Sequence, residues 1–581
     1  MAIFGERGAA AHRVDMARRA LVSAVLATAA TGVMAAEPPA LDVVLTPQVQ
    51  EGRIVRLDVD MRLSAPAIDA GKTIVRAPVV LVGTPMAAYP AEAIRANDEK
   101  GELTLTASEE PATPTGTYRR WTADRATVGD VRLRYGTAPR VVNAETRNGP
   151  LFDLRSEAGG IIGSGNYFYA LPESRAPHRV SLHWDLSKAP AGWRGVWSLG
   201  EGDQTAVIPP DTLAFSFYAA GPVQSKPQAQ LSPTSPFAFY WLSPPPFDPI
   251  QLATDTEKLY KFMSKFFEDA GGSYRVFVRG NPYKAGGGTA LAKSFMFSYG
   301  VTGETASGGD EQMLLAHEMA HNWPRLDGDE HALTAWYTEG TAEYYSTLLA
   351  LRAGAISLDK FLKLANEKAD DYYTNPYRTL SNAEAGKKFW QDARAQRVPY
   401  GRGFMYFARL DALLRASSKG KKRLDDLVLA VQRAQRRGGK VGLEEWDRMV
   451  TKALGAAGRK DFDAMVAGER IEMPPTTFGP CFKPVASTAA PFELGFDDMR
   501  LGAVSKLVEG SAAAKAGLKE GDRIVDLTPL REVRENATAH MALTVERDGQ
   551  LLKVDYLPRG TAVPSVQWAR VTTVPDTACK L

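Results

Sequence analysis

The segment LLAHEMAHNWP, residues 314–324, carries two histidines four residues apart and a glutamate directly after the first of them. Residues four apart share one face of an α-helix, so His317 and His321 can present their imidazoles to a single ion. The chain has 7 histidines, and a chance HExxH motif is expected in about one per cent of such chains or fewer. The segment therefore predicts a metal-binding helix that ends at Pro324, with two surface histidines as the alternative.

A third ligand is expected from the next helical segment, which contains WYTEGTAEYY. A catalytic zinc usually has three protein ligands and one position left for water. We expect Glu339 to be the third ligand to one Zn²⁺ ion. Glu343 lies four residues further on, and we expect it to reach the second nitrogen of a ligand histidine. The flanking tryptophan and tyrosines indicate a packed helix, whereas two exposed carboxylates are the alternative.

This ligand set predicts hydrolytic chemistry. A zinc ion held in this way lowers the pKa of its water to about 7 and polarises a scissile carbonyl. Glu318 is then placed to move the proton as general base. A metzincin would carry glycine and then histidine downstream, where this chain has Pro324 and Asp327, so that class fits poorly.

The composition is that of a globular protein of several domains. The chain has 581 residues, a formal net charge of +3 and 24% charged residues. This length predicts roughly three or four folded units. The near-neutral charge does not suggest a nucleic-acid partner, and the basic runs SKGKKR and QRAQRRGGK adjoin helical patterns that make solvated helix faces the better interpretation.

The first 36 residues resemble an export signal. Arginines 13, 18 and 19 precede the apolar run ALVSAVLATAATGVMAA, which ends in small residues. We expect cleavage after Ala35 or Ala36, with an uncleaved membrane anchor as the alternative. No later segment is apolar enough to predict a membrane span, so we expect a periplasmic or secreted protein. In that compartment Cys481 and Cys579 are predicted to form a disulfide, and two free buried thiols are the alternative.

The hydrophobic period changes along the chain. Alternating runs such as RIVRLDVDMRL predict an all-β domain over residues 37–235. The stretch 219–237 at its boundary is rich in Pro, Ser and Gln and is interpreted as a linker or a long connection. Helical spacing then dominates and predicts a mainly α-helical catalytic domain over residues 236–475. A turn-rich gap separates it from a mixed C-terminal segment.

The motifs HEMAHNW, WYTEG and YGRGFMYFARLD together resemble the gluzincin metallopeptidases, and specifically the glycyl aminopeptidase family that ends in a PDZ domain. The resemblance implies a thermolysin-like catalytic domain and peptide substrates. It also implies that Tyr400, which precedes Arg402 and Gly403, stabilises the reaction intermediate. Without the resemblance Tyr400 would be interpreted as a packed aromatic residue.

The C-terminal text fits the same resemblance. ELGFDDM and VEGSAAAKAGLKEGDRIVDL are similar to the carboxylate-binding loop of a PDZ domain and to the elements that follow it. A PDZ domain is therefore expected over residues 486–565, followed by a C-terminal tail over 566–581. Backbone N–H groups of Leu494, Gly495 and Phe496 would capture the C-terminus of a peptide. A PDZ domain that only packs on the catalytic unit is the alternative.

One departure from the family concerns substrate binding. The family carries a Gly-Gly-x-Glu stretch whose backbone aligns the substrate and whose glutamate holds the free amine. Here Gly286, Gly287 and Gly288 are present, but Ala290 stands where the acid is expected. Together with the export signal, the resemblance implies an exported zinc aminopeptidase that favours small N-terminal residues. A zinc endopeptidase, or a non-catalytic PDZ peptide-binding protein with a vestigial zinc site, are the alternatives.

Overall fold

The computed structural model describes residues 37–113, 115–146, 149–228, 235–269, 272–283, 286–301, 310–328, 331–389, 392–498, 500–579 and 581. The expected signal segment, residues 1–36, lies outside the described residues. Residues 39–581 form one unit by their internal contacts, and the description below concerns that unit.

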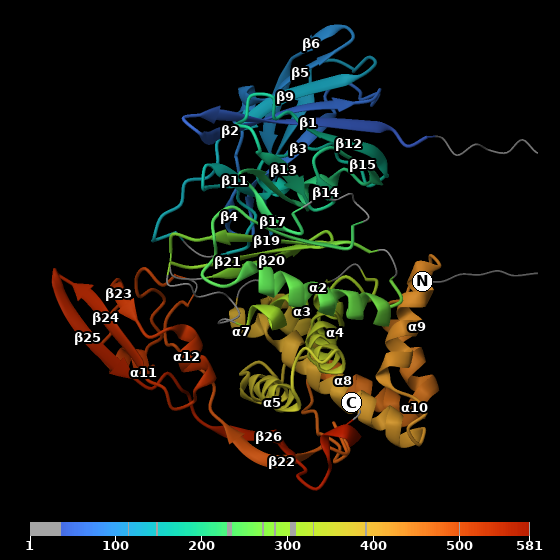
Figure 1. Cartoon of the computed structure of the whole chain (residues 1–581), viewed down its shortest axis with the longest axis vertical. Coiled ribbons are helices and arrows are strands. Elements are labelled where there is room, and N and C mark those ends of the chain that lie inside the picture. The colour runs from blue at the N-terminus through green and yellow to red at the C-terminus, as the bar shows by residue number, and fades with distance from the viewer. Residues whose placement is uncertain are drawn as a thin grey trace, which may run out of the picture. The chain divides into compact units, whose positions relative to one another are not determined.

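Three sheets build the described part of the N-terminal region (Figure 1). The first has the order β15 (Gln204–Ile208), β12 (His178–Trp184), β1 (Ala40–Gln50), β2 (Arg53–Leu63), β9 (Val131–Thr137), β5 (Arg95–Asp98) and β6 (Gly101–Leu103). The second has the order β4 (Thr84–Pro85), β3 (Thr73–Leu81), β8 (Gly116–Ala123) and β7 (Leu105–Glu109). The third has the order β10 (Arg155–Glu157), β11 (Gly160–Ser164), β16 (Phe217–Gly221), β13 (Arg194–Trp197) and β14 (Gly200–Glu201). Short helical turns η1 (Ala91–Ala93), η2 (Gly165–Tyr167) and α1 (Asp211–Ala214) connect strands.

The alternation in the sequence explains these strands. In β1 every second residue is buried, among them Leu41, Val43 and Leu45, while the residues between them stay partly exposed. This period of two is expected where one face of a sheet covers a core. The prediction of a β-rich N-terminal region is thus confirmed.

A fourth sheet, with the order β17 (Gln224–Lys226), β18 (Phe237–Trp241), β19 (Tyr274–Gly280), β21 (Ser294–Tyr299) and β20 (Gly287–Leu291), precedes most of the helices. Its three central strands, β18, β19 and β21, are buried on both faces. Phe237 and Phe239 belong to the same hydrophobic core as the helices, whereas Ala238 and Tyr240 pack with residues of the third sheet.

The position of β17 corrects the linker prediction. This strand lies inside the stretch 219–237 and pairs antiparallel with β18, so the catalytic sheet begins before residue 236. The prediction failed because the local composition favours turns, while the strand is stabilised by a partner from outside its own segment.

The helices follow in a mainly α-helical region, as predicted. They are α2 (Pro249–Phe266), α3 (Glu311–Ala320), α4 (His331–Arg352), α5 (Leu358–Thr374), α6 (Asn382–Lys388), α7 (Ala393–Gln396), α8 (Val398–Ser417), α9 (Leu424–Arg436) and α10 (Leu443–Ala467). Local signals set their ends: Asp248 caps α2 by accepting hydrogen bonds from the N–H groups of Ile250 and Gln251. Within the described ranges, none of the helices combines the length and the apolar character needed to cross a membrane.

Helices α4 and α8 cross with their backbones in contact. A Cβ atom added at Gly403 would lie 2.2 Å from the carbonyl oxygen of Trp336 and 2.4 Å from Cα of Gly340. Two residues earlier, a Cβ atom at Gly401 would lie 3.0 Å from Cα of Tyr372 in α5. The two glycines of YGRG therefore allow α8 to approach α4 and α5 closely. Between them, Arg402 is buried and donates hydrogen bonds to the carbonyl oxygens of Arg378 and Leu380.

The C-terminal segment contains a ribbon and a small module. Strands β22 (Phe482–Ala489) and β26 (Val563–Arg570) pair antiparallel, and the ribbon packs on α5, where Trp568 is buried and its N–H donates to Asn366. Between these strands lie α11 (Ala512–Lys515), β23 (Arg523–Leu527), α12 (Leu530–Glu535), β24 (Met541–Arg547) and β25 (Gln550–Tyr556), followed after the ribbon by the turn η3 (Asp576–Ala578). This module has its own hydrophobic core. Its assignment as a PDZ domain stays a prediction.

The ribbon corrects the C-terminal boundaries. Residues 566–581 are not a tail, because most of β26 lies in this range and belongs to the main core. The predicted limits 486–565 also cut through both strands of the ribbon, so the module occupies the residues between them. Sequence pattern alone did not reveal a pairing across more than seventy residues. The predicted disulfide between Cys481 and Cys579 is present.

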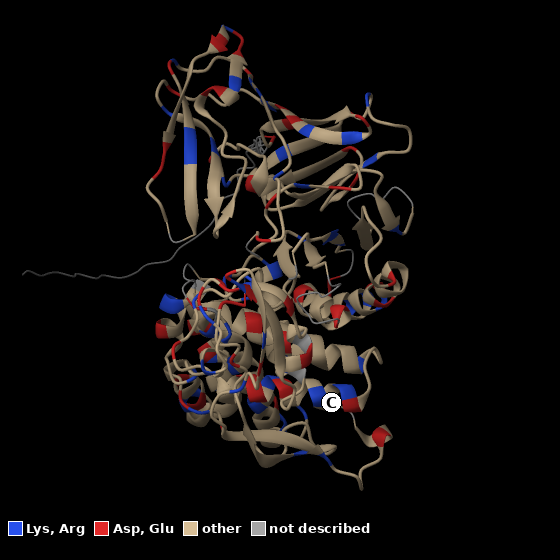
Figure 2. Ribbon diagram, turned by 90° about the vertical axis from the view of Figure 1, so that its left-hand side faces the viewer, with Lys and Arg blue, Asp and Glu red and all other residues tan. Residues whose placement is uncertain are grey.

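Charged residues of both signs are intermingled over the strands and helices (Figure 2). Many pair locally, as Arg62 does with Asp42 at 2.7 Å and Asp130 at 2.6 Å. Such exposed pairs contribute little to stability individually, so the folded state depends mainly on the cores.

The crossing of α4 and α8 predicts that Gly403→Ala is damaging. The added methyl group has no room, and overpacking of this kind costs about 1–3 kcal/mol of unfolding free energy. We expect a lower thermal midpoint by circular dichroism and a reduced zinc content after purification. Gly149→Ala is the control, because a Cβ atom there meets only Thr84 Oγ1 at an ordinary 3.5 Å. A Gly403→Ala protein with unchanged midpoint and zinc content would contradict this account.

Candidate metal centre

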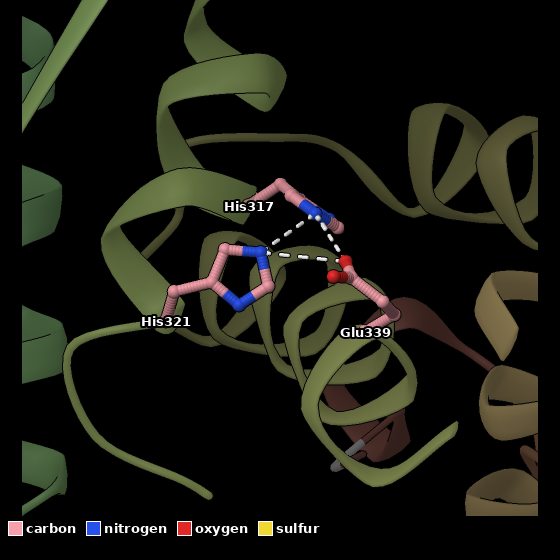
Figure 3. A group of neighbouring side chains, drawn as sticks. All are labelled: His317, His321 and Glu339. Atoms are coloured by element: carbon pink, nitrogen blue, oxygen red, sulfur yellow. Dashed lines mark hydrogen bonds and ion pairs between the residues drawn. The ribbon is translucent and has the colours of Figure 1, made fainter. Parts of the chain in front are cut away.

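Helices α3 and α4 bring the three predicted donors together (Figure 3). His317 lies in the last turn of α3 and His321 directly follows it, while Glu339 projects from α4. The Nε2 atoms of the two histidines are 3.1 Å apart, and each lies 3.4 Å from Oε2 of Glu339. A tetrahedral zinc about 2.1 Å from each donor needs donors separated by about 3.4 Å. The spacing of the three atoms therefore fits one zinc ion.

The end of α3 is anchored from outside the site. The indole N–H of Trp323 donates to the carboxylate of Asp269 at 2.8 Å, and the ring stacks on Phe267 with centroids 4.9 Å apart. This residue fixes the chain two positions after His321. The second histidine consequently stays in register although the helix has ended.

Glu339 is held as a charged donor. The residue is only 8% exposed, and its Oε2 atom has no hydrogen-bond donor among the described residues. Burial acts to raise the pKa of Glu339, but the imidazoles of His321 and His317 outweigh it and hold that pKa well below its ordinary value. A buried carboxylate oxygen without a donor is costly unless a cation is bound there. The donor set thus suits a metal ion better than an apolar or empty core.

Glu343 lies behind His317, as the spacing predicted. Its Oε1 atom is 3.1 Å from Nδ1 of His317, and its other oxygen forms an ion pair with Lys368 of α5. A carboxylate against Nδ1 orients the ring and leaves Nε2 for the metal. Lys368 was not predicted from the sequence. It lies on α5, whereas Glu343 lies on α4, so no spacing within one helix connects the two residues. Burial lowers the pKa of this lysine to about 8.

Glu318 lies next to His317 on α3 and takes no part in the donor triangle. Burial raises the pKa of Glu318, and the opposing effect of His321 and His317 does not cancel that rise. Its charge interacts with both imidazoles and with Glu339, which places it at the same site. A carboxylate with a raised pKa, beside the donors but not among them, can accept and return a proton.

Tyr400 covers the other side of His317. The two rings are parallel, with an interplanar angle of 7° and centroids 5.7 Å apart. Burial, together with the charges of Glu339 and Glu318, raises the pKa of Tyr400 well above its ordinary value. The phenol therefore stays protonated near neutral pH and can donate a hydrogen bond. The residue that only the resemblance singled out does lie at the metal cluster.

The predicted substrate strand is an edge strand. Gly287 and Gly288 begin β20, which pairs with β21 on one side only, and Gly286 precedes it. Ala290 is exposed, so the position expected to carry an acid offers only a methyl group. The residues predicted to bind a peptide C-terminus, Leu494, Gly495 and Phe496, lie in the C-terminal module, and the side chains of Leu494 and Phe496 are buried there.

A family model described as M61 glycyl aminopeptidase matches residues 311–402, from the start of α3 to the first turns of α8. Among solved structures, the chain is similar to an aminopeptidase N family protein from Idiomarina loihiensis. The identity is 15% and the TM-score 0.60, over 93% of this chain and 99% of that one. It is also similar to an M1 zinc metallopeptidase from Deinococcus radiodurans at 17% identity and a TM-score of 0.46, over 76% and 95% of the two chains. A third similarity is to yeast LTA4 hydrolase, at 13% identity and a TM-score of 0.44, over 76% and 68%. No curated protein matches the chain.

The chain is a zinc metallopeptidase. The matched range contains the three donors, Glu318, Glu343 and Tyr400, so the family match and the geometry concern the same residues. The likeness to the Idiomarina protein shows a shared fold, with a β-rich N-terminal region before the helical region. The C-terminal module lies outside the family match.

The contact behind His317 predicts the effect of Glu343→Gln on metal binding in this metallopeptidase. Loss of the carboxylate charge at Nδ1 should weaken zinc binding about 10–100-fold, the range found for such outer contacts. Competition against a chelator of known affinity measures it. Glu444→Gln, at an exposed position of α10, should leave the affinity unchanged, and His317→Ala should abolish it. Wild-type affinity in Glu343→Gln would show that this carboxylate does not support the ligand.

Proposed function

We propose that this metallopeptidase is an exported aminopeptidase that removes small N-terminal residues from peptides. One observation carries the proposal: three donor atoms spaced for a single zinc lie beside a carboxylate with a raised pKa, Glu318, and beside the phenol of Tyr400, which stacks on His317. The combination of a cation site, a base and a hydrogen-bond donor is what hydrolysis of an amide requires.

Each residue has a distinct task in this proposal. His317, His321 and Glu339 would hold the zinc ion, which would supply polarisation of the scissile carbonyl and a more nucleophilic water near neutral pH. Glu318 takes the proton from the attacking water and passes it to the leaving amine. Tyr400 donates its hydroxyl proton in a hydrogen bond to the oxyanion that develops on the carbonyl. Glu343 and Lys368 keep the ring of His317 in place.

Strand β20 is the proposed platform for the peptide. Its free edge can add an extended substrate as a further strand, and the glycines at 286–288 leave room for a close approach of two backbones. This arrangement would orient the peptide without regard to its side chains. A preference for small N-terminal residues would then be determined by the side chains that surround the substrate's first residue.

An endopeptidase is the second candidate, and Ala290 favours it. No carboxylate lies on the described strand β20, so nothing there binds a free N-terminal amine. Without that anchor, a peptide could slide along the edge and be cut internally. A non-catalytic peptide-binding protein fits less well, because the base and the phenol are both retained together with the donors.

Export and the role of the C-terminal module belong to the same proposal. Residues 1–36 would direct the chain to the periplasm or the outside, where the disulfide between Cys481 and Cys579 is stable. The module between β22 and β26 would be a PDZ domain, and its loop at Leu494–Phe496 would accept a peptide C-terminus.

The proposal is tested with a mixed peptide library and the purified, zinc-loaded protein. Mass spectrometry should show trimming from the amino end, and a chelator should abolish it. Glu318→Gln should keep its zinc and lose about 10²–10⁴-fold in turnover, because the base is gone. Internal cuts would favour the endopeptidase, and full activity in Glu318→Gln would refute the assigned base.

The stacking of Tyr400 on His317 leads to a separate prediction. Tyr400→Phe keeps the ring and removes only the hydroxyl, so kcat should fall by about 10²–10³-fold while KM stays close to that of the wild type. Steady-state kinetics on one peptide substrate measure both constants. Tyr372→Phe is the control, since that hydroxyl accepts a hydrogen bond from the backbone of Ile471, away from the cluster. An unchanged kcat would return Tyr400 to a packing role.

A further inference from the structure

Strand β20, which we expect to bind the peptide substrate, carries no carboxylate that could bind the substrate's N-terminal amine. The carboxylates of Glu339 and Glu343 are engaged with the histidines, and Glu318 is needed for proton transfer. Because Ala290 is exposed on β20 and carries no charge, the charged end of a substrate must be recognised from another element.

Arg397 lies in the right place. It has helical backbone angles, φ −80° and ψ −12°, and directly precedes α8, so it occupies the helical position one turn before Tyr400. Residues three apart lie on the same helix face. Since the ring of Tyr400 is stacked on His317, a long side chain at 397 starts next to the metal cluster. The charge of Arg397 also acts on the Tyr400 hydroxyl, against the larger effect of burial on that pKa.

The guanidinium of Arg397 is exposed and uncommitted. Among the described residues, no carboxylate lies within ion-pair distance of it, and no carbonyl oxygen accepts a hydrogen bond from it. Other arginines at this end of α8 are occupied: Arg402 bonds to carbonyl oxygens, and Arg394 pairs with Asp392 at 2.7 Å. Arg397 therefore has its donors free for a ligand.

Asp371 is the competing candidate for recognition of a charge. It is an exposed carboxylate on α5, beside the point where Tyr372 touches Gly401. The charges of Arg397, Lys368 and Arg534 all act on Asp371, so three cations share its surroundings. An ammonium group bound there would be repelled by these cations.

We propose that Arg397 forms the binding site for a carboxylate of the peptide substrate, close to the scissile bond. The guanidinium fork suits a carboxylate, which it can hold through two parallel hydrogen bonds. The carboxylate comes from the C-terminus of a short peptide or from an acidic side chain. This proposal rests on the proposed peptidase function and specifies its substrates: short or acidic peptides bind better than amidated neutral ones.

The test measures binding, so it does not require turnover. In the zinc-loaded Glu318→Gln protein, calorimetry compares Ala-Ala-Ala with Ala-Ala-Ala-amide, and Ala-Glu-Ala-amide with Ala-Gln-Ala-amide. We expect at least one acid to bind about tenfold more tightly than its neutral partner. Adding Arg397→Gln should reduce this ratio to less than twofold, and Arg397→Lys should restore part of it. Arg437→Gln is the matched control, because Arg437 is also an exposed arginine without a described partner at a helix end.

The outcomes separate the alternatives. A ratio lost only for the free C-terminus, or only for the glutamate side chain, supports the site and identifies the source of the carboxylate. Equal affinities for acids and neutral partners, or a ratio that survives Arg397→Gln, would overturn it. So would an equal loss of affinity for all four peptides, which indicates a general positioning role. If Arg397-dependent binding is present but the wild-type protein cleaves nothing, the carboxylate site stands and the peptidase proposal fails.

Discussion

The backbone contact between α4 and α8 at Gly340 and Gly403 determines where the chemistry takes place. Glu339 directly precedes Gly340, and Tyr400 lies one turn before Gly403, so the crossing brings a metal donor and a hydroxyl donor to the same place. Interiors are packed as densely as organic crystals, and helices held at backbone contact cannot slide to absorb an added group. The third contact, Gly401 against Tyr372, adds α5 with Lys368 to this arrangement. The positions of Glu339, Tyr400 and Lys368 therefore depend on close helix contacts at three glycines, Gly340, Gly401 and Gly403.

Features with local origins could be predicted from the sequence. The spacing of four between His317 and His321, and again between Glu339 and Glu343, is a property of one helix, so it identified the donors and the contact behind them. Alternation with period two identified the β-rich region in the same way. Tyr400 was different, because a tyrosine in an apolar helix is ordinarily a packed residue, and only the likeness of YGRG to a family motif gave it a role.

Features that depend on distant partners could not be predicted. Lys368 is one of many lysines on amphipathic helices, and only the packing of α5 against α4 brings it to Glu343. Strand β17 lies in a stretch rich in proline and serine, and it exists because β18 offers an edge. Strand β26 was interpreted as a tail because its partner, β22, lies beyond the whole C-terminal module. In each case the stabilising partner is distant in the sequence, so local patterns do not reveal it.

The ribbon of β22 and β26 has a consequence for how the C-terminal module is retained. The module leaves the ribbon from one strand and returns to the other, and the disulfide between Cys481 and Cys579 joins the chain on both sides of it. A protease that nicks an exposed loop of the module would produce two fragments still covalently joined, with β26 still paired to β22. Such a cut would release an ordinary terminal domain. Here, in an environment rich in proteases, the ribbon of β22 and β26 would stay packed on α5 after the cut.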